Sequence, residues 1–127
     1  MTKTMFEMVR DFHTAFGQRV GEKPEFPDIN ERSLRTRLMK EEFNEYNKAE
    51  DNNDIINLAV ELADIIYIAC GTAVSYGIPL DEVFNAIHTA NMNKLVDGKV
   101  IRREDGKIKK PDGWQPADIE GILKKHS

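Results

Sequence analysis

The sequence contains a single cysteine, Cys70, so the chain cannot form an internal disulfide. Cys70 lies in an apolar stretch, where a thiol is more often a small core residue than a nucleophile. No apolar signal segment follows Met1, so we expect a cytoplasmic protein. An excess of positive charge is also absent, because the net charge is -4 and the pI is about 5.4. We therefore expect no nucleic-acid partner and no attraction to anionic lipid.

The length of 127 residues suits one domain with a sizeable core. A hydrophobic content of 40 %, a charged content of 31 % and a mean hydropathy of -0.53 are ordinary for a globular protein outside the membrane. We predict a single all-α domain over residues 1–127. A bundle would occupy about residues 4–95, and a basic loop with a short terminal helix would occupy residues 96–127.

The stretch Ile55–Leu80 contains no Lys or Arg and is apolar on nearly every side at helical spacing. This pattern predicts a helix surrounded by other helices. Glu61 and Asp64 lie in its middle, and together with Asn57 they make a membrane-spanning role costly. Burial of an unpaired carboxylate costs on the order of several kcal/mol, so a cation must meet these two acids or they must be neutralised. We take that cation to be a metal ion.

Capping residues and helix breakers divide the rest of the chain into helices. Thr4 and Glu7 form a capping-box pattern, and Asn30 or Ser33 is a suitable cap for a second helix. Asp54 is a suitable cap for the apolar helix. The expected helices run from Thr4 to Gly17, from Asn30 or Ser33 to about Ala49, from Asp54 to about Tyr76 or Gly77, from Pro79 to Leu95, and from Asp118 to Lys125.

The second helix carries Glu41, Glu42 and Glu45 on the face that also holds Leu34 and Leu38. The polar turn after it is short, so this helix and the apolar helix are expected to be antiparallel neighbours. The two helices then present four carboxylates to one point. Oxygen ligands of this kind select a hard divalent cation, Mg²⁺ or alternatively Mn²⁺. The predicted ligands are Glu42, Glu45, Glu61 and Asp64.

Other carboxylates also lie three residues apart in this chain, so spacing alone carries little weight; these two pairs differ in their apolar setting. No Glu is followed three residues later by His, which disfavours a di-iron centre. The alternative is that the acids form buried ion pairs with Arg35, Arg37, Lys94 or the tail lysines.

A metal held by carboxylates leaves positions for phosphate groups, which also need cationic partners. Lys94 and the tail residues Lys107, Lys109 and Lys110 are candidates, although tail lysines are equally typical of a solvated chain end. Trp114 either stacks on a base or pins the tail to the bundle.

Three segments in order, Leu38–Glu45, Glu61–Asp64 and Asn91–Lys94, resemble the all-α nucleoside triphosphate pyrophosphohydrolase superfamily. That superfamily includes MazG-like enzymes, phosphoribosyl-ATP pyrophosphohydrolases and dimeric dUTPases. The resemblance covers about residues 34–116 and implies a four-helix-bundle-like MazG-type fold, with helices from neighbouring subunits completing the core. It also implies Mg²⁺ at the two acidic pairs, a catalytic role for Glu41, and substrate contacts at Asn91 and Lys94. The tail, with Lys110 and Trp114, looks like the end of compact members near the dimeric dUTPase branch.

The implied activity is hydrolysis of a nucleoside triphosphate between the α and β phosphates, giving a monophosphate and pyrophosphate. The expected substrate is a (d)NTP such as dUTP, dCTP or a modified nucleotide. The chain lacks the extra helices of many dimeric dUTPases, so uracil specificity does not carry over. We expect a homodimer or homotetramer. Two alternatives are a non-catalytic metal- or nucleotide-binding helical regulator and a module whose acids bind a basic partner.

Overall fold

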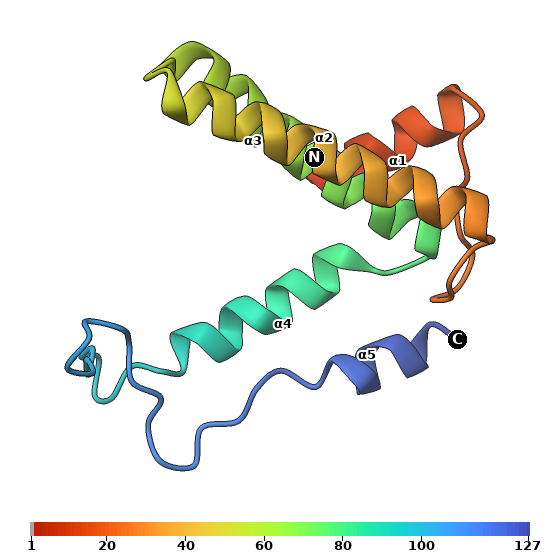
Figure 1. The fold of residues 1–127 in the computed structure, drawn as a ribbon. Helices are drawn as coiled ribbons and strands as arrows, with labels where there is room; N and C mark the ends of the chain where they lie inside the picture. Colours follow the sequence, from red (N-terminus) through yellow and green to blue (C-terminus); the bar gives the residue numbers. More distant parts are fainter. Residues whose placement is uncertain (1) are drawn as a thin grey trace. The chain divides into compact units, whose positions relative to one another are not determined.

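The computed structural model describes residues 2–127, and within this range every regular element is an α-helix. Two isolated β-bridges are the only strand-like pairings there. The predicted all-α fold is confirmed. Figure 1 shows the helices, which are α1 Met5–Ala15, α2 Ile29–Asp51, α3 Ile55–Tyr76, α4 Leu80–Met92 and α5 Ile119–Lys125.

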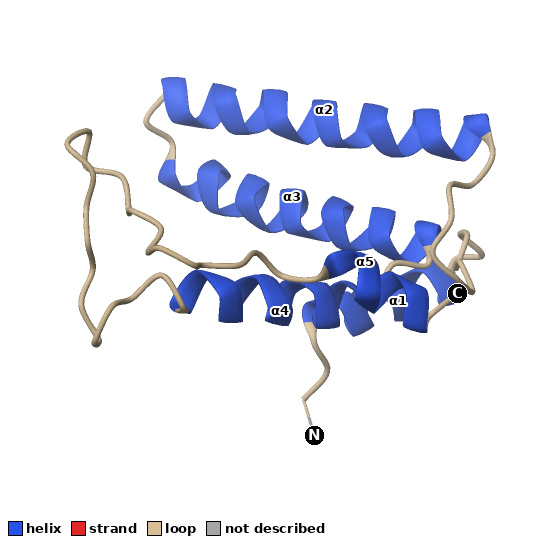
Figure 2. Ribbon diagram, turned by 90° about the horizontal axis from the view of Figure 1, so that it is seen from below, coloured by secondary structure: helices blue, strands red, loops and turns tan. Residues whose placement is uncertain are grey.

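The chain forms two compact units, one ending at Leu80 and one spanning Asp81–His126. In the first unit, α3 packs against both α1 and α2. The polar turn between α2 and α3 makes them antiparallel neighbours along their length, as Figure 2 shows. This pairing lets side chains near the middle of α2 meet side chains near the middle of α3.

Helix α1 begins at the predicted capping box. The Thr4 hydroxyl accepts a hydrogen bond from the Glu7 amide at 3.1 Å, and the Glu7 carboxylate accepts one from the Thr4 amide at 2.9 Å. Two N–H groups that would otherwise be unpaired at the helix start are thereby satisfied. The predicted start and the predicted end before Gly17 are both confirmed.

Helix α2 begins earlier than expected. Its cap is Asp28, whose carboxylate accepts a hydrogen bond from the Glu31 amide at 2.9 Å, so the assignment of the cap to Asn30 or Ser33 was wrong. Asp28 directly follows Pro27 and is the first residue after it that can cap. Its negative charge also suits the positive end of the helix dipole. The earlier start adds a turn to α2 without changing the face that carries Glu42.

Helix α3 starts after its predicted cap Asp54, whose carboxylate accepts a hydrogen bond from the Asn57 amide at 3.0 Å. It ends at Gly77, which has a left-handed backbone with φ +70°. A β-carbon at Gly77 would collide with the backbone carbonyl of Lys23. Glycine is therefore required there both for its backbone conformation and for the close approach of the preceding loop.

The core of the first unit lies between α1 and the C-terminal half of α3. Val9, Cys70 and Val74 are buried together, with Phe6 and Leu80 packed against them. Cys70 is therefore a core residue, as its setting predicted. The N-terminal half of α3 differs from expectation, because Ile55 and Ile56 are 73 % and 76 % exposed in the single chain.

Helix α3 is also long and apolar enough to cross a membrane by length and composition, a property that the core helix of a water-soluble protein can share. Its two acids in mid-helix remain the argument against that role.

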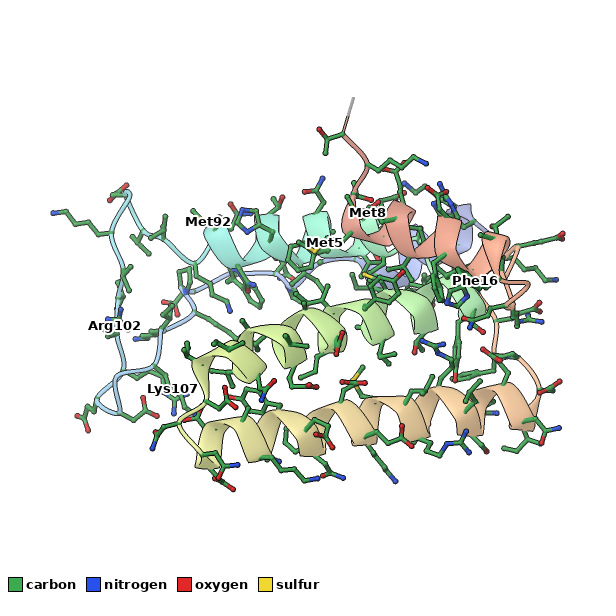
Figure 3. The ribbon with its side chains drawn as sticks, turned by 90° about the horizontal axis from the view of Figure 1, so that it is seen from above. Met5, Met8, Phe16, Met92, Arg102 and Lys107 are labelled. Carbon is green, nitrogen blue, oxygen red and sulfur yellow. The ribbon has the colours of Figure 1, made fainter. Side chains whose placement is uncertain are left out.

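The second unit consists of α4, a loop with two turns, and α5. Helix α4 ends at Met92, short of the expected Leu95, because the amides of Lys94 and Leu95 donate to the carbonyls three residues back, those of Asn91 and Met92, and no longer to carbonyls four residues back. The side chains of Arg102 and Lys107 lie in the loop that follows (Figure 3). Asp118 caps α5 as predicted.

The Trp114 indole N–H donates to the Ala90 carbonyl at 2.7 Å, which ties the loop to α4. Glu82 near the start of α4 contacts both Lys125 at 2.6 Å and His126 at 3.0 Å, which ties α5 to the same helix.

Candidate functional site

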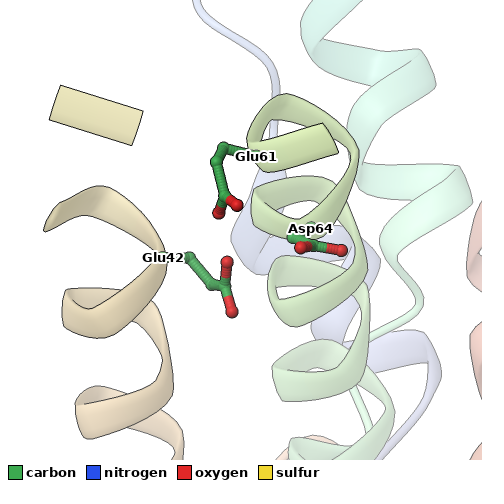
Figure 4. A group of neighbouring side chains, drawn as sticks. All are labelled: Glu42, Glu61 and Asp64. Carbon is green, nitrogen blue, oxygen red and sulfur yellow. The ribbon is translucent and has the colours of Figure 1, made fainter. Parts of the chain in front are cut away.

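Three carboxylates meet between α2 and α3. Glu42 extends from α2, and Glu61 and Asp64 extend from α3, as Figure 4 shows. One oxygen from each of the three lies within 4.8 Å of the other two. Glu61 and Asp64 are three residues apart and so share a face of α3, and the antiparallel pairing places Glu42 opposite them. We call Glu42, Glu61 and Asp64 the acidic cluster.

The closeness of these groups raises the pKa of Glu42. A hydrogen bond shared with Glu61 raises the pKa of Glu42 to about 7, and partial desolvation and the charges of Asp64, Glu61 and Glu45 act in the same direction. Carboxylates held this close cannot all be ionised unless positive charge is supplied. In the metal-free protein, a proton shared with Glu61 fills that role.

One oxygen of the acidic cluster lacks a partner. The Oε2 atom of Glu61 is shielded from solvent and has no hydrogen-bond partner. No ion pair joins Glu42, Glu61 or Asp64 to a basic group anywhere in residues 2–127. A buried oxygen without a hydrogen-bond partner lowers the stability of the folded protein. A cation bound to that oxygen would remove this cost. The donor set, all carboxylate oxygen, fits a hard divalent ion.

The buried ion pairs considered as the alternative do not form at this cluster. Arg37 lies near the exposed Glu41, with 3.8 Å between Arg37 Nε and Glu41 Oε1. Arg35 is buried but donates to Thr72 and Ile68 instead.

The other two predicted acids lie outside the cluster. Glu45 is paired with Lys48, whose Nζ lies 3.3 Å from Glu45 Oε1. Glu41 is exposed and projects from the neighbouring position on α2. Both belong to the same stretch of α2 as Glu42, and Glu45 is close enough for its charge to affect the pKa of Glu42. Their predicted roles as ligand and catalytic group stay predictions.

The predicted substrate contacts all belong to the second unit. Lys94 Nζ and Lys110 Nζ lie 5.2 Å and 5.1 Å from the centre of the Trp114 ring, within the range of cation–π attraction. Asn91 is exposed near the end of α4. The indole thus holds the loop on α4 and gathers two ammonium groups around itself.

A second polar group was not anticipated from the sequence. His13, Arg19, Glu31 and Arg35 line one cavity in the first unit. From the sequence, Arg35 is a candidate ion-pair partner for the acids and has no other predicted role. The available signal was its position between Leu34 and Leu38 on the apolar face of α2, where a charged residue is unusual.

A comparison with protein families finds a match over most of the chain. The sequence model of a family described as phosphoribosyl-ATP pyrophosphohydrolase matches residues 9–91. This range contains the whole acidic cluster and most of α1 and α4. No curated protein matches the chain.

Proposed function

Because the chain belongs to the phosphoribosyl-ATP pyrophosphohydrolase family, and so is a pyrophosphohydrolase of a nucleotide-like substrate, we propose that it cleaves a nucleoside triphosphate between the α and β phosphates. The products are a nucleoside monophosphate and pyrophosphate. The observation that carries this proposal is the acidic cluster, which has a solvent-shielded, unpartnered Glu61 oxygen and no basic group paired to it among the described residues. As substrate we propose a (d)NTP such as dUTP, dCTP or a modified nucleotide.

Members of this family typically depend on a divalent metal ion, and we propose Mg²⁺ here, with Mn²⁺ as an alternative. Glu42, Glu61 and Asp64 would hold the ion, with Glu45 joining them after release from Lys48. When bound, the ion supplies positive charge that offsets the charge of the triphosphate. Donors that are all carboxylate oxygens support this choice over zinc or iron.

Glu41 is our candidate for orienting the attacking water and taking its proton. Its carboxylate is exposed beside the acidic cluster on α2, and its Oε1 lies 3.8 Å from Arg37 Nε. In the reaction, the water oxygen forms a bond to phosphorus, the α–β anhydride bond breaks, and the electron pair leaves with pyrophosphate. Lys94 and Lys110 would neutralise phosphate charge, while Asn91 and Trp114 would position the nucleotide and the two lysines.

We also propose that the protein is a homodimer or homotetramer. Support comes from the exposed apolar side chains on the N-terminal half of α3, because a helix that is apolar on all sides is normally covered by other helices. The largest exposures on this half of α3 are those of Ile55, Ile56, Val60 and Leu62.

The first test of the activity is substitution of Glu61 by Gln. Glutamine keeps the size of the side chain but removes the charge, so the variant should lose Mg²⁺-dependent pyrophosphate release by at least about 100-fold while keeping its helical circular dichroism. Glu50→Gln is the matched control, since Glu50 is exposed at the end of α2. Pyrophosphate release is measured on a panel of ordinary and modified dNTPs.

Retained activity in the Glu61→Gln variant would contradict the assignment of the site. If the wild-type protein binds nucleotides without releasing pyrophosphate from any of them, the protein is a nucleotide-binding regulator. An effect of Mg²⁺ on melting of the wild-type protein, absent in the variant, would separate a metal site from a surface that binds basic partners.

A further inference from the structure

The loop that follows α4 in the second unit carries a surplus of positive charge. Residues 96–110 contain six basic and three acidic side chains, a net charge of +3 in a chain whose total is -4. We call this segment the basic arm. Every one of its residues from 97 to 110 is exposed. A segment of opposite charge to the rest of its own protein is suited to a partner with an acidic surface.

Backbone hydrogen bonds give the basic arm a defined shape. Val96 and Lys99 close its first turn by exchanging two backbone hydrogen bonds, of 2.8 and 2.9 Å. In its second turn, the Lys109 amide donates to the Ile101 carbonyl at 2.7 Å, and the Arg103 amide donates across the turn at 2.7 Å. A preformed segment loses less conformational freedom on binding than a mobile one, so it is a better docking element.

One face of the basic arm combines aliphatic and cationic side chains. Arg102 and Ile108 form an antiparallel bridge, and the side chains of such a pair lie on the same side of a hairpin. Val100 and Lys110 share that side, because side chains alternate along a strand. Val100 and Ile108 are 47 % and 50 % exposed. The Arg102 guanidinium donates to the Gly106 carbonyl at 2.9 Å and forms no ion pair within the described residues.

The turn between α2 and α3 in the first unit has the opposite charge. We call residues 50–58 the turn surface, which contains three acids and no base. Asp51 is exposed there and forms no ion pair with any described residue. Ile55 and Ile56 are 73 % and 76 % exposed. A cavity of about 220 Å³ lies in this surface, and both the aliphatic Ile55 and the acidic Asp54 line it.

The basic arm and the turn surface are therefore complementary. Each combines exposed aliphatic side chains with charges of one sign, and the two signs are opposite. A nucleic acid would neutralise the charges of the arm but leave Val100 and Ile108 in water. A protein surface with an acidic rim and an apolar hollow satisfies both kinds of side chain, and this chain itself provides such a surface.

We propose that the basic arm of one copy docks on the turn surface of a second copy, with Ile108 in the cavity beside Ile55 and Arg102 paired with Asp51 and Asp54. Both surfaces belong to every copy, so the contact can form twice around a two-fold axis and give a closed dimer. Burial of the isoleucines removes apolar surface from water, and charge-assisted hydrogen bonds from arginine fix the register. The proposal rests on the homo-oligomer proposed above and names the segment that covers part of its exposed α3 surface.

Cross-linking between two differently tagged chains tests the contact directly. One chain carries Asn52→Cys on the turn surface, and the other carries Glu104→Cys in the basic arm; both positions are exposed. After the chains are mixed and treated with a short bis-maleimide, we expect a product that contains one chain of each tag. The native Cys70 is buried and contributes little background. In the control mixture, Thr14→Cys on α1 replaces Asn52→Cys and should give at least about tenfold less of this mixed product.

Sedimentation equilibrium tests the ion pairs. Arg102→Glu places a negative charge against the turn surface, so the dissociation constant of the assembly should rise at least about tenfold. Asp51→Arg should have a similar effect, and the double variant, in which the two charges are exchanged, should recover most of the loss. Lys23→Glu is the control, because it makes the same change of charge at an exposed residue outside both surfaces. Far-UV circular dichroism verifies that each variant is folded.

Several results would overturn the proposal. A wild-type mass of one chain removes both the homo-oligomer and the docking. An oligomer that gives no mixed product, or in which Arg102→Glu and Lys23→Glu behave alike, removes the docking alone. A cross-link within one chain that carries both cysteines, under conditions where the tagged chains give no mixed product, would assign the arm to its own subunit. None of these measurements involves pyrophosphate release, so a failure of the proposed activity remains separate.

Discussion

Glu42 and Glu61 are two close carboxylates that no basic side chain of the described residues neutralises. Each is ordinary in sequence, and their spacing predicts only which face of a helix they share. The consequence appears when α2 and α3 pair, because the carboxylates are then close enough for Glu42 to keep a proton near neutral pH. Their behaviour as a pair is therefore testable without any nucleotide.

The raised pKa of Glu42 predicts an unusual pH dependence for the metal-free protein. The folded value of about 7 exceeds the ordinary 4.5, so folding favours the protonated form, and this contribution is lost as pH rises from about 4.5 through 7. After discounting for solvent screening, Glu42→Gln should raise the melting temperature at pH about 8 by roughly 4 °C, with little change at pH about 5. Melting is followed by circular dichroism with a chelator present.

Glu41→Gln is the control for this experiment, because Glu41 is the exposed neighbour outside the acidic cluster. An equal stabilisation by both substitutions would show that general surface charge, and not the shared proton, is responsible.

At the scale of elements, the end of α3 depends on one glycine. Gly77→Ala should reduce the free energy of unfolding by about 2–4 kcal/mol, combining the left-handed backbone with the collision at Lys23. Gly17→Ala is the matched variant, since Gly17 has φ +68° but nothing within 4 Å of an added β-carbon. It should cost only the conformational part, about 1–2 kcal/mol. Urea denaturation of both variants measures the difference, and equal losses would contradict the role of the collision.

The ends of the helices were predictable where only one nearby residue could cap or break the helix. Four residues cap a helix where the sequence indicated: Thr4, Asp54, Gly77 and Asp118. The start of α2 was not predicted, because Asp28, Asn30 and Ser33 can all cap a helix and only the tertiary position of the preceding loop decides among them. The end of α4 was missed because its apolar spacing continues past Met92 while its backbone turns back.

The candidate site was likewise predictable only in part. Helical periodicity indicates that the acids of α2 and α3 share faces, and a short turn indicates antiparallel pairing. Periodicity does not give side-chain rotamers, so the separation of Glu45 from the acidic cluster by Lys48 was not foreseeable. The cavity lined by Arg35 combines residues from α1, α2 and α3, and a β-carbon at Gly71 would collide with Arg35 Nη2, relationships that no local pattern records.

At the scale of the whole molecule, the exposed half of α3 predicts self-association. Sedimentation equilibrium should give a mass of two or four times the 14.5 kDa chain. Ile56→Lys should shift the mass toward one chain, because Ile56 is 76 % exposed in the single chain and a charge is costly in an apolar interface. Thr14→Lys, at an exposed polar position on α1, is the control. A wild-type mass of one chain would refute the prediction.

The position of Trp114 gives the second unit a built-in optical signal. It is the single tryptophan of the chain, it donates to α4, and two ammonium groups lie near its ring. Indole emission responds to nearby charge and to solvent, so any ligand that draws Lys94 or Lys110 away will change the fluorescence of the unmodified protein. Occupancy of this region can therefore be followed in real time, without an attached dye and independently of turnover.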